Sequence, residues 1–297
     1  MLYFYHLFFK LVVFLGLDNF VSTYFRKSKL LLKLIPKRGF YDWPTRKKVN
    51  ICGVHFELMP KDNGQYRLFK PHYKHPDNYG INHILSTIKN EKNIVVLDIG
   101  ANVGQHSLQL GNQILKRLPS VNLTILAFEP NPKARQFFSK NLSLNPQLKN
   151  KIEIIPVGLG STKENLELQA PKRDTACGSL VRNYQHEPHE SEFVTVTTLD
   201  NYLMKKVSVE KVDFIKIDVE NFEYEVLKGA LKTLRKFKPK MYIEMGQKPA
   251  EQGKIYQFLF DLDYQVAAEN GDELIPVIKD NYESFIKPKS LYNIWVV

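Results

Sequence analysis

The stretch VVLDIGANVG, residues 95–104, decides the fold of this chain. An apolar run ends in the acid Asp98, two glycines follow at Gly100 and Gly104, and a helical pattern begins near Gln105. This order predicts a buried strand that turns sharply into a helix, with a ligand at the helix N-terminus. The two glycines let the backbone turn tightly and approach that ligand without an intervening Cβ.

The residues of this loop discriminate between two classes of cofactor. A dinucleotide site uses G-x-G-x-x-G, in which the second glycine lets the pyrophosphate reach the backbone. Here Asn102 stands at that position, and Asp98 would repel a pyrophosphate. The same carboxylate suits the ammonium group of an amino-acid moiety. The loop from Asp98 through Ala101 to Gly104 therefore favours S-adenosylmethionine over NAD as the bound cofactor.

The second half of the predicted cofactor site lies on the next two strands. Residues 124–128 form an apolar strand, and Glu129 stands at its C-terminal end. An acid about 20 to 30 residues past a glycine loop accepts hydrogen bonds from ribose hydroxyls. A third strand is predicted over 151–158, and its end would meet the adenine ring. Val157 is expected to supply an apolar wall there.

A fourth strand, predicted over 212–219, carries the candidate catalytic residues. Lys216 lies inside this strand and needs a partner, because burying an unpaired ammonium is costly. Asp218 and Glu220 follow at the C-terminal end, where open α/β sheets bind their ligands. The structural alternative is that both carboxylates cap the helix predicted over 222–237. A fifth strand ends in another acid, Glu244.

Four motifs occur in a fixed order along the chain: DIGANVG at 98–104, FEPNP at 128–132, TLD at 198–200 and VDFIKIDVE at 212–220. Together they resemble the FkbM-type methyltransferases, over a region from about Asn93 to the C-terminus. The resemblance implies an S-adenosylmethionine-dependent enzyme that methylates a hydroxyl of a sugar, a glycan or a small natural product. One departure is Asn221, where the family usually has glycine, although Asn tolerates left-handed backbone.

The predicted fold class is α/β, with a Rossmann-like seven-stranded methyltransferase sheet, helices on both faces and an antiparallel last strand over 292–297. Three regions are expected along the chain. Residues 1–38 form an apolar and basic helical arm, residues 39–92 a prelude, and residues 93–297 the methyltransferase domain. The prelude should hold a small hairpin, with a strand pattern over residues 49–58 that breaks at Gly53 and a turn signal at Asn63-Gly64. An insertion over 159–209 should place a second hairpin, built from residues 165–169 and 192–198, over the active site.

The positive charge of the chain is concentrated in the arm. The formal net charge is +11, and residues 1–48 hold ten Lys and Arg against two Asp, which leaves only +3 for the other 249 residues. Polar side chains form a narrow stripe on an otherwise apolar helix over 2–25, and the longest fully apolar run is too short to span a bilayer. Three interpretations stay open: peripheral contact with anionic lipid, packing on the domain or on a second subunit, and a weak transmembrane anchor.

The two cysteines, Cys52 and Cys177, lie far apart without metal-ligand spacing and indicate reduced thiols in a cytoplasmic protein. If the arm binds lipid, the inner membrane face is the expected location. The histidines also show no ligand spacing, so no metal site is predicted.

Methyl transfer from a sulfonium needs alignment, exclusion of water and removal of the hydroxyl proton, for which Asp218 or Glu220 is the expected base. Two rival functions remain. The first is an RNA 2′-O-methyltransferase, because the basic arm could contact phosphates and Lys216 with its acids is similar to part of the Lys-Asp-Lys-Glu set of those enzymes. A nearly neutral domain disfavours nucleic acid. The second is a membrane-docked protein that binds S-adenosylmethionine without catalysis.

Overall fold

The computed structural model describes Leu11 and residues 47–59, 62, 64–65, 81–87, 91–172, 174, 178–181, 186, 188–206, 209–270, 273–286 and 292–297. The predicted arm over 1–38 lies outside these residues except for Leu11, so its three interpretations stay predictions. Within the described ranges, none of the helices combines the length and apolar character that a bilayer span requires.

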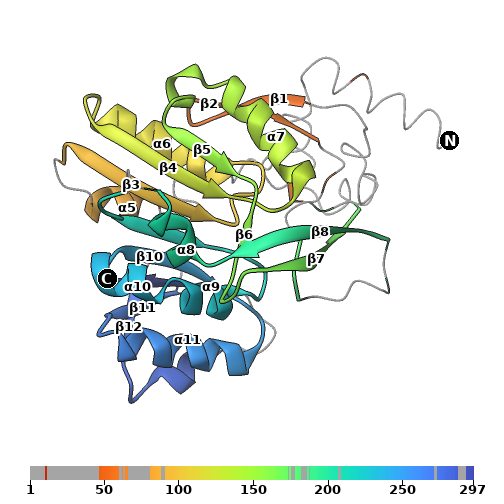
Figure 1. Ribbon diagram of the computed structural model, residues 1–297. Helices are drawn as coiled ribbons and strands as arrows, with labels where there is room; N and C mark the ends of the chain where they lie inside the picture. Colours follow the sequence, from red (N-terminus) through yellow and green to blue (C-terminus); the bar gives the residue numbers. More distant parts are fainter. Residues whose placement is uncertain are drawn as a thin grey trace, which may run out of the picture.

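One mixed eight-stranded sheet forms the centre of the molecule, in the order β12-β11-β13-β10-β9-β3-β4-β5 (Figure 1). Its strands are β3 (Asn93–Ile99), β4 (Asn122–Phe128), β5 (Ile152–Ile155), β9 (Phe214–Ile217), β10 (Lys240–Met245), β11 (Val266–Asn270), β12 (Glu273–Val277) and β13 (Tyr292–Val296). The five neighbouring strands β5, β4, β3, β9 and β10 are parallel, and β13 inserts antiparallel between β10 and β11. The α/β class and the antiparallel last strand are confirmed.

The expected number of seven strands is wrong by one, because β12 adds an eighth strand at the edge of the sheet. It pairs antiparallel with β11, and Pro276 lies within it. Proline within an apolar run argues against a central strand, but an edge strand tolerates it because one side makes no ladder bonds. Only the position at the edge makes this segment a strand.

Successive side chains of a strand point to opposite faces, and each face of this sheet has its own core. Alternate residues of β3 illustrate the division, since Val96 packs in one cluster and Leu97 in the other. The first face is covered by α5 (Ile81–Thr87), α6 (Gln105–Arg117) and α7 (Pro132–Ser143). The second is covered by α8 (Leu199–Met204), α9 (Glu223–Gly229), α10 (Leu231–Phe237) and α11 (Pro249–Asp261). Figure 1 shows these two groups of helices on opposite sides of the sheet, as predicted.

The prelude hairpin is present, but its turn is not at Asn63-Gly64. Strands β1 (Lys47–Ile51) and β2 (Val54–Leu58) pair antiparallel through a turn at Cys52-Gly53. Both turn residues have positive φ, 54° and 85°. A two-residue turn with this backbone matches the right-handed twist of its strands, so the segment 49–58 folds back on itself.

The region predicted as an insertion contains a hairpin whose strands extend beyond residues 165–169 and 192–198. Strands β7 (Glu164–Pro171) and β8 (His189–Thr197) pair antiparallel, and the short β6 (Gly158–Leu159) lies parallel to β8. Thr198 then caps α8 by accepting a hydrogen bond from Asn201 N at 3.0 Å.

The single helix predicted over 222–237 is broken into α9 and α10 at Ala230. A Cβ on Gly229 would lie 1.9 Å from the carbonyl oxygen of Gly160, so the chain comes very close to β6 there. Asp200 accepts hydrogen bonds from the backbone amides of Lys232 and Thr233, at 2.9 and 2.8 Å. The Asp of the TLD motif therefore caps a helix that is distant in sequence, which is a structural role.

Candidate active site

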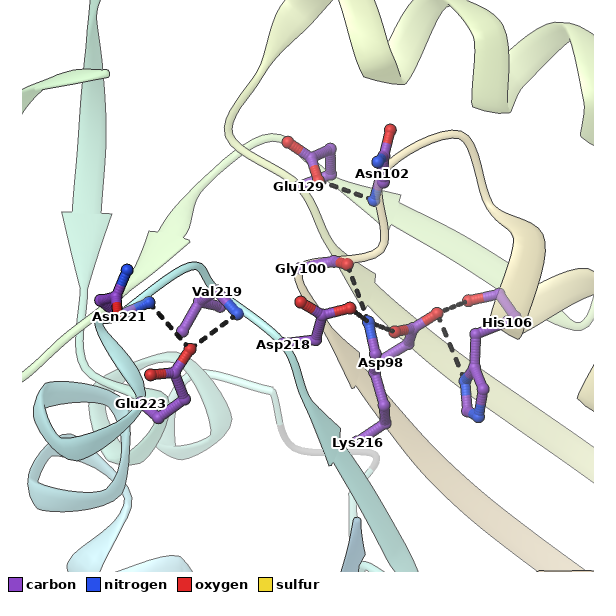
Figure 2. A network of polar contacts seen from close by, with 11 residues as sticks. Asp98, Gly100, Asn102, His106, Glu129, Lys216, Asp218, Val219, Asn221 and Glu223 are labelled. Carbon is purple, nitrogen blue, oxygen red and sulfur yellow. Dashed lines mark hydrogen bonds and ion pairs between the residues drawn. The ribbon is translucent and has the colours of Figure 1, made fainter. Parts of the chain in front are cut away.

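The carboxyl ends of three neighbouring parallel strands bring the predicted acids to one edge of the sheet (Figure 2). Asp98 lies near the end of β3, Glu129 directly follows β4, and Asp218 directly follows β9. Because β9 pairs with β3 in register, Asp98 lies opposite Lys216. Residues 118 positions apart in the sequence thus become neighbours in one sheet.

Lys216 connects the glycine loop to Asp218-Val219-Glu220, the D-x-E segment that follows β9. Its Nζ lies 3.5 Å from Asp98 Oδ1 and 3.1 Å from Asp218 Oδ2, and it donates to the carbonyl oxygen of Gly100 at 3.0 Å. The Lys216 side chain is only 4% exposed. Although burial lowers the pKa of Lys216, the charges of Asp218 and Asp98 raise it overall, so the side chain stays charged. The sequence required a partner for this lysine, and the structure provides two.

Asp98 is fully buried and is also bound by the first turn of α6. Ser107 Oγ donates to Asp98 Oδ2 at 2.5 Å, and His106 Nδ1 lies 3.7 Å from the same oxygen. Burial alone would raise the pKa of Asp98, but the charge of Lys216 and the contacts with His106 and Ser107 hold it well below its usual range. The carboxylate therefore joins β3, β9 and α6. Sequence reasoning had not assigned a site role to His106 or Ser107.

The glycine loop has the predicted tight turn, with φ of 81° at Gly100, 50° at Asn102 and 84° at Gly104. The expected reason for the glycines is corrected. A Cβ on Gly100 would lie 1.8 Å from the carbonyl oxygen of Asp218, and one on Gly104 would lie 2.1 Å from the ring of Phe138. The absence of side chains at these glycines leaves room for Asp218, directly after β9, and for Phe138 on α7. From the sequence, we had expected a ligand to occupy this space.

Glu129 joins the glycine loop to the segment that follows β4. Its Oε2 accepts from Asn102 N at 2.7 Å, and its Oε1 accepts from Asn131 N at 2.8 Å. Burial raises the pKa of Glu129 to about 7, against the opposing effect of these two amides. Glu129 N in turn donates to Ile155 O at the end of β5. Val157, two residues further on, is half-buried and packs against the core of the second face.

The D-x-E segment turns through two consecutive left-handed residues, Glu220 with φ of 56° and Asn221 with φ of 74°. Glu223 Oε1 accepts from Val219 N at 3.3 Å and from Asn221 N at 3.1 Å, which closes the turn (Figure 2). Asn221 Oδ1 accepts from Gln247 N at 2.7 Å. The turn therefore forms with asparagine at the position of the family's usual glycine.

Glu223 was missed in the sequence, where its only signal is an acid three positions after Glu220. Its side chain is buried, and burial together with the charge of Asp218 raises its pKa to about 7, although backbone hydrogen bonds oppose the shift.

Glu244 is the second acid whose importance the structure reveals. It lies on β10, beside β9, where the charge of Asp218 acts on it. The negative charge of Asp218, followed by burial, raises the pKa of Glu244 to about 10. Burial also acts to raise the pKa of Asp218, but Lys216 and the hydrogen bond from Glu244 lower it overall. The two neighbouring acids are thus shifted in opposite directions, with the proton favoured on Glu244 and the charge on Asp218.

The sheet order, the antiparallel last strand and the acids at the carboxyl edge define a Rossmann-like methyltransferase fold. The sequence model of the methyltransferase FkbM domain matches residues 98–266, and the chain belongs to this family. Within the described residues, no cluster of three or more His, Cys, Asp or Glu could hold a metal ion.

Two curated relatives can be compared in sequence. The hexuronic acid methyltransferase AglP of Haloferax volcanii is 26% identical over 148 residues, which cover 49% of this chain and 53% of AglP. The methyltransferase sdnD of Sordaria araneosa is 28% identical over 163 residues, which cover 46% of this chain and 60% of sdnD. The chain thus spans between half and two thirds of the length of these relatives. The crystal structure of a methyltransferase FkbM from Methylobacillus flagellatus superposes with a TM-score of 0.48 and 15% identity, over 71% of this chain and 45% of that chain.

Proposed function

We propose that this protein transfers the methyl group of S-adenosylmethionine to a hydroxyl of a sugar, a glycan or a small natural product. The observation that carries the proposal is the contact of one buried cation, Lys216, with both halves of the site. It binds Asp98 and the Gly100 carbonyl on the cofactor side and Asp218 on the acceptor side. Methyl transfer needs two reactants held in a fixed line, and a shared rigid element supports that requirement.

The cofactor would lie over the loop from Gly100 through Ala101 and Asn102 to Gly104. Asn102 Oδ1 is buried and has no hydrogen-bond partner among the residues that the structure describes, which fits an acceptor that awaits a ligand donor. Glu129 would accept from the ribose hydroxyls, and Val157 would pack against adenine. Asp98 is too deeply buried for direct contact, so we assign it the role of holding the loop through Lys216 and Ser107.

The sulfonium of the bound cofactor supplies an already activated methyl group. The chain then has to orient the acceptor hydroxyl and take its proton. Lys216 and Glu244 hold Asp218 as a carboxylate with a lowered pKa, so it is a weak base. We assign to Asp218 the role of orienting the hydroxyl by accepting its hydrogen bond, and to Glu220 the role of removing the proton.

Two considerations support a sugar acceptor over RNA. The relative AglP is named a hexuronic acid methyltransferase, which supports a sugar derivative as the class of acceptor. The described acceptor side also places the carboxylates of Asp218 and Glu220 directly after β9, and an RNA phosphate is itself an anion, so the residues there offer it little attraction.

The proposal is tested by calorimetric titration with S-adenosylmethionine and NAD, followed by incubation with glycosides, natural-product alcohols and RNA while S-adenosylhomocysteine release is measured. We expect the protein to bind S-adenosylmethionine but not NAD, and to methylate a hydroxyl acceptor other than RNA. Glu220→Gln should lower turnover by about 10² to 10⁴ with cofactor affinity retained, because a positioned base contributes that much. Glu153→Gln, far from the acceptor side on β5, is the control. Binding of S-adenosylmethionine without turnover on any acceptor would favour a non-catalytic binding protein. Methylation of RNA would favour an RNA 2′-O-methyltransferase.

A further inference from the structure

A short segment between β7 and β8, residues 178–181, lies against the D-x-E turn. Ser179 forms a two-way backbone bridge to Gln169 of β7, with its N donating at 2.9 Å and its O accepting at 3.0 Å. Its side chain Oγ donates to the carbonyl oxygen of Glu220 at 2.8 Å. Ser179 is 1% exposed. The insertion thus delivers one buried hydroxyl to the backbone of the proposed catalytic base.

The carbonyl that accepts this bond belongs to an unusual stretch of backbone. Glu220 and Asn221 both have positive φ, which is uncommon for residues other than glycine. Such conformations persist only where the surrounding structure holds them. Glu223 binds the amides on either side of Glu220, and Ser179 binds the carbonyl between Glu220 and Asn221. The turn is therefore held from its own helix and, independently, from the insertion.

The same segment also reaches the cofactor half of the site. A Cβ on Gly178 would lie 3.6 Å from Nδ2 of Asn131, an ordinary contact distance. Asn131 N donates to Glu129, and Asn131 Oδ1 caps α7. Residues 178 and 179 therefore lie between the strand end that carries Glu129 and the strand end that carries Glu220.

We propose that Ser179 is a positioning residue for Glu220, and that the insertion sets the orientation of the base relative to the cofactor through this hydroxyl. The inference rests on the proposed function, because it gives Glu220 its role as base. Without the hydroxyl, the peptide between Glu220 and Asn221 loses its bond to the insertion and keeps only the bonds from Glu223. The base then samples orientations that do not face the acceptor hydroxyl.

The test compares three variants of the full chain. Ser179→Ala removes the hydroxyl, Ser179→Thr keeps it, and Ser161→Ala is the matched control. Ser161 precedes the same hairpin and donates to the carboxylate of Glu225 on α9, away from the turn. On the hydroxyl acceptor that the wild type methylates, Ser179→Ala should lower kcat by up to about 10²-fold, since small misplacement has that effect. The KM for S-adenosylmethionine should stay within about twofold, and Ser179→Thr should recover most of the rate.

Hydrogen exchange at the amide of Asn221 gives a second readout that needs no acceptor. Ser179→Ala should accelerate this exchange, whereas the exchange rate in Ser161→Ala should stay close to that of wild type. The unfolding midpoints of both variants should also stay close to that of wild type. Unchanged kcat together with unchanged exchange in Ser179→Ala would overturn the proposal, and so would equal losses in Ser161→Ala. If the wild type binds S-adenosylmethionine but methylates no acceptor, the proposed function fails, and the exchange data alone still decide whether Ser179 positions the turn.

Discussion

Asp98 and Lys216 are register partners on neighbouring parallel strands, and Lys216 Nζ lies 3.5 Å from Asp98 Oδ1. The two side chains are 0% and 4% exposed. Neither charge could be buried alone, because an unpaired charge in the interior costs several kcal/mol. The pair therefore joins the glycine loop after β3 and the residues after β9 electrostatically.

Lys216→Met should lower the free energy of unfolding by about 3 to 5 kcal/mol, because it leaves buried carboxylates without their cation. Urea denaturation of the apo protein measures this loss. Adding Asp98→Asn should restore part of it by removing one uncompensated charge. Lys211→Met, which removes a partly exposed ion pair with Glu91 and Asp213, should cost only about 0 to 1 kcal/mol. Equal losses for the two lysines would contradict the account of Lys216.

Gly100→Ala should destabilise the fold and weaken cofactor binding together. The new Cβ would lie 1.8 Å from Asp218 O, and the φ of 81° already disfavours any side chain. Gly253→Ala is the matched control inside α11, where a Cβ would meet only Ile286 at 3.6 Å. Because alanine is a better helix former, that variant should gain about 0.5 to 1 kcal/mol. Thermal unfolding and calorimetry of both variants decide the matter, and a stable Gly100→Ala protein would be the contrary result.

The affinity for S-adenosylmethionine should rise as pH increases from 6 to 8. Burial raises the pKa of Glu129 to about 7, so below that pH the free side chain is largely protonated and has less capacity to accept from ribose hydroxyls. Calorimetric titration across this range measures the effect. Glu129→Gln should weaken binding and flatten the pH dependence. A pH dependence that persists unchanged in Glu129→Gln would have to come from another group.

Glu223 should make the apo protein less stable at pH 8 than at pH 5. Burial raises its folded pKa to about 7 from an ordinary value of 4.5, so its contribution to stability is full below the unfolded pKa and is lost as pH rises through 7. Glu223→Gln keeps an acceptor for Val219 N and Asn221 N but cannot ionise. It should therefore gain about 1 to 3 kcal/mol over wild type at pH 8 and little at pH 5.

Glu225→Gln is the control for this experiment. Burial acts to raise the pKa of Glu225, but hydrogen bonds from Lys228 and Ser161 lower it overall, so it does not titrate between pH 5 and 8. Unfolding temperatures at both pH values provide the measurement. A pH profile for Glu223→Gln that parallels wild type would assign the titration to a different carboxyl.

Local patterns in the sequence were sufficient for the individual elements of the domain. The strand, glycine loop and helix around Gly100 could be predicted from hydrophobic periodicity and from the conformational freedom of glycine. Both are properties of residues that are close together in the sequence. The α/β class, the insertion hairpin and the order of the acids at the strand ends follow for the same reason. The sequence showed a break of the strand pattern at Gly53 but not that the hairpin turns there, because a cysteine with positive φ at position 52 has no sequence signal. The edge strand with Pro276 was missed because its pairing depends on a neighbour.

The chemistry of the site depended on the tertiary structure. Sequence reasoning named Lys216, Asp218 and Glu220 but could not show that strand register places Lys216 against Asp98. It also could not show that the charge of Asp218 raises the pKa of Glu244 on the neighbouring strand. Protonation and ion pairing depend on burial and on distances of a few ångströms between residues far apart in the chain. The sequence by itself determined which side chains stand at the strand ends, and only the folded arrangement decided which of them carry charge and which hold one another in place.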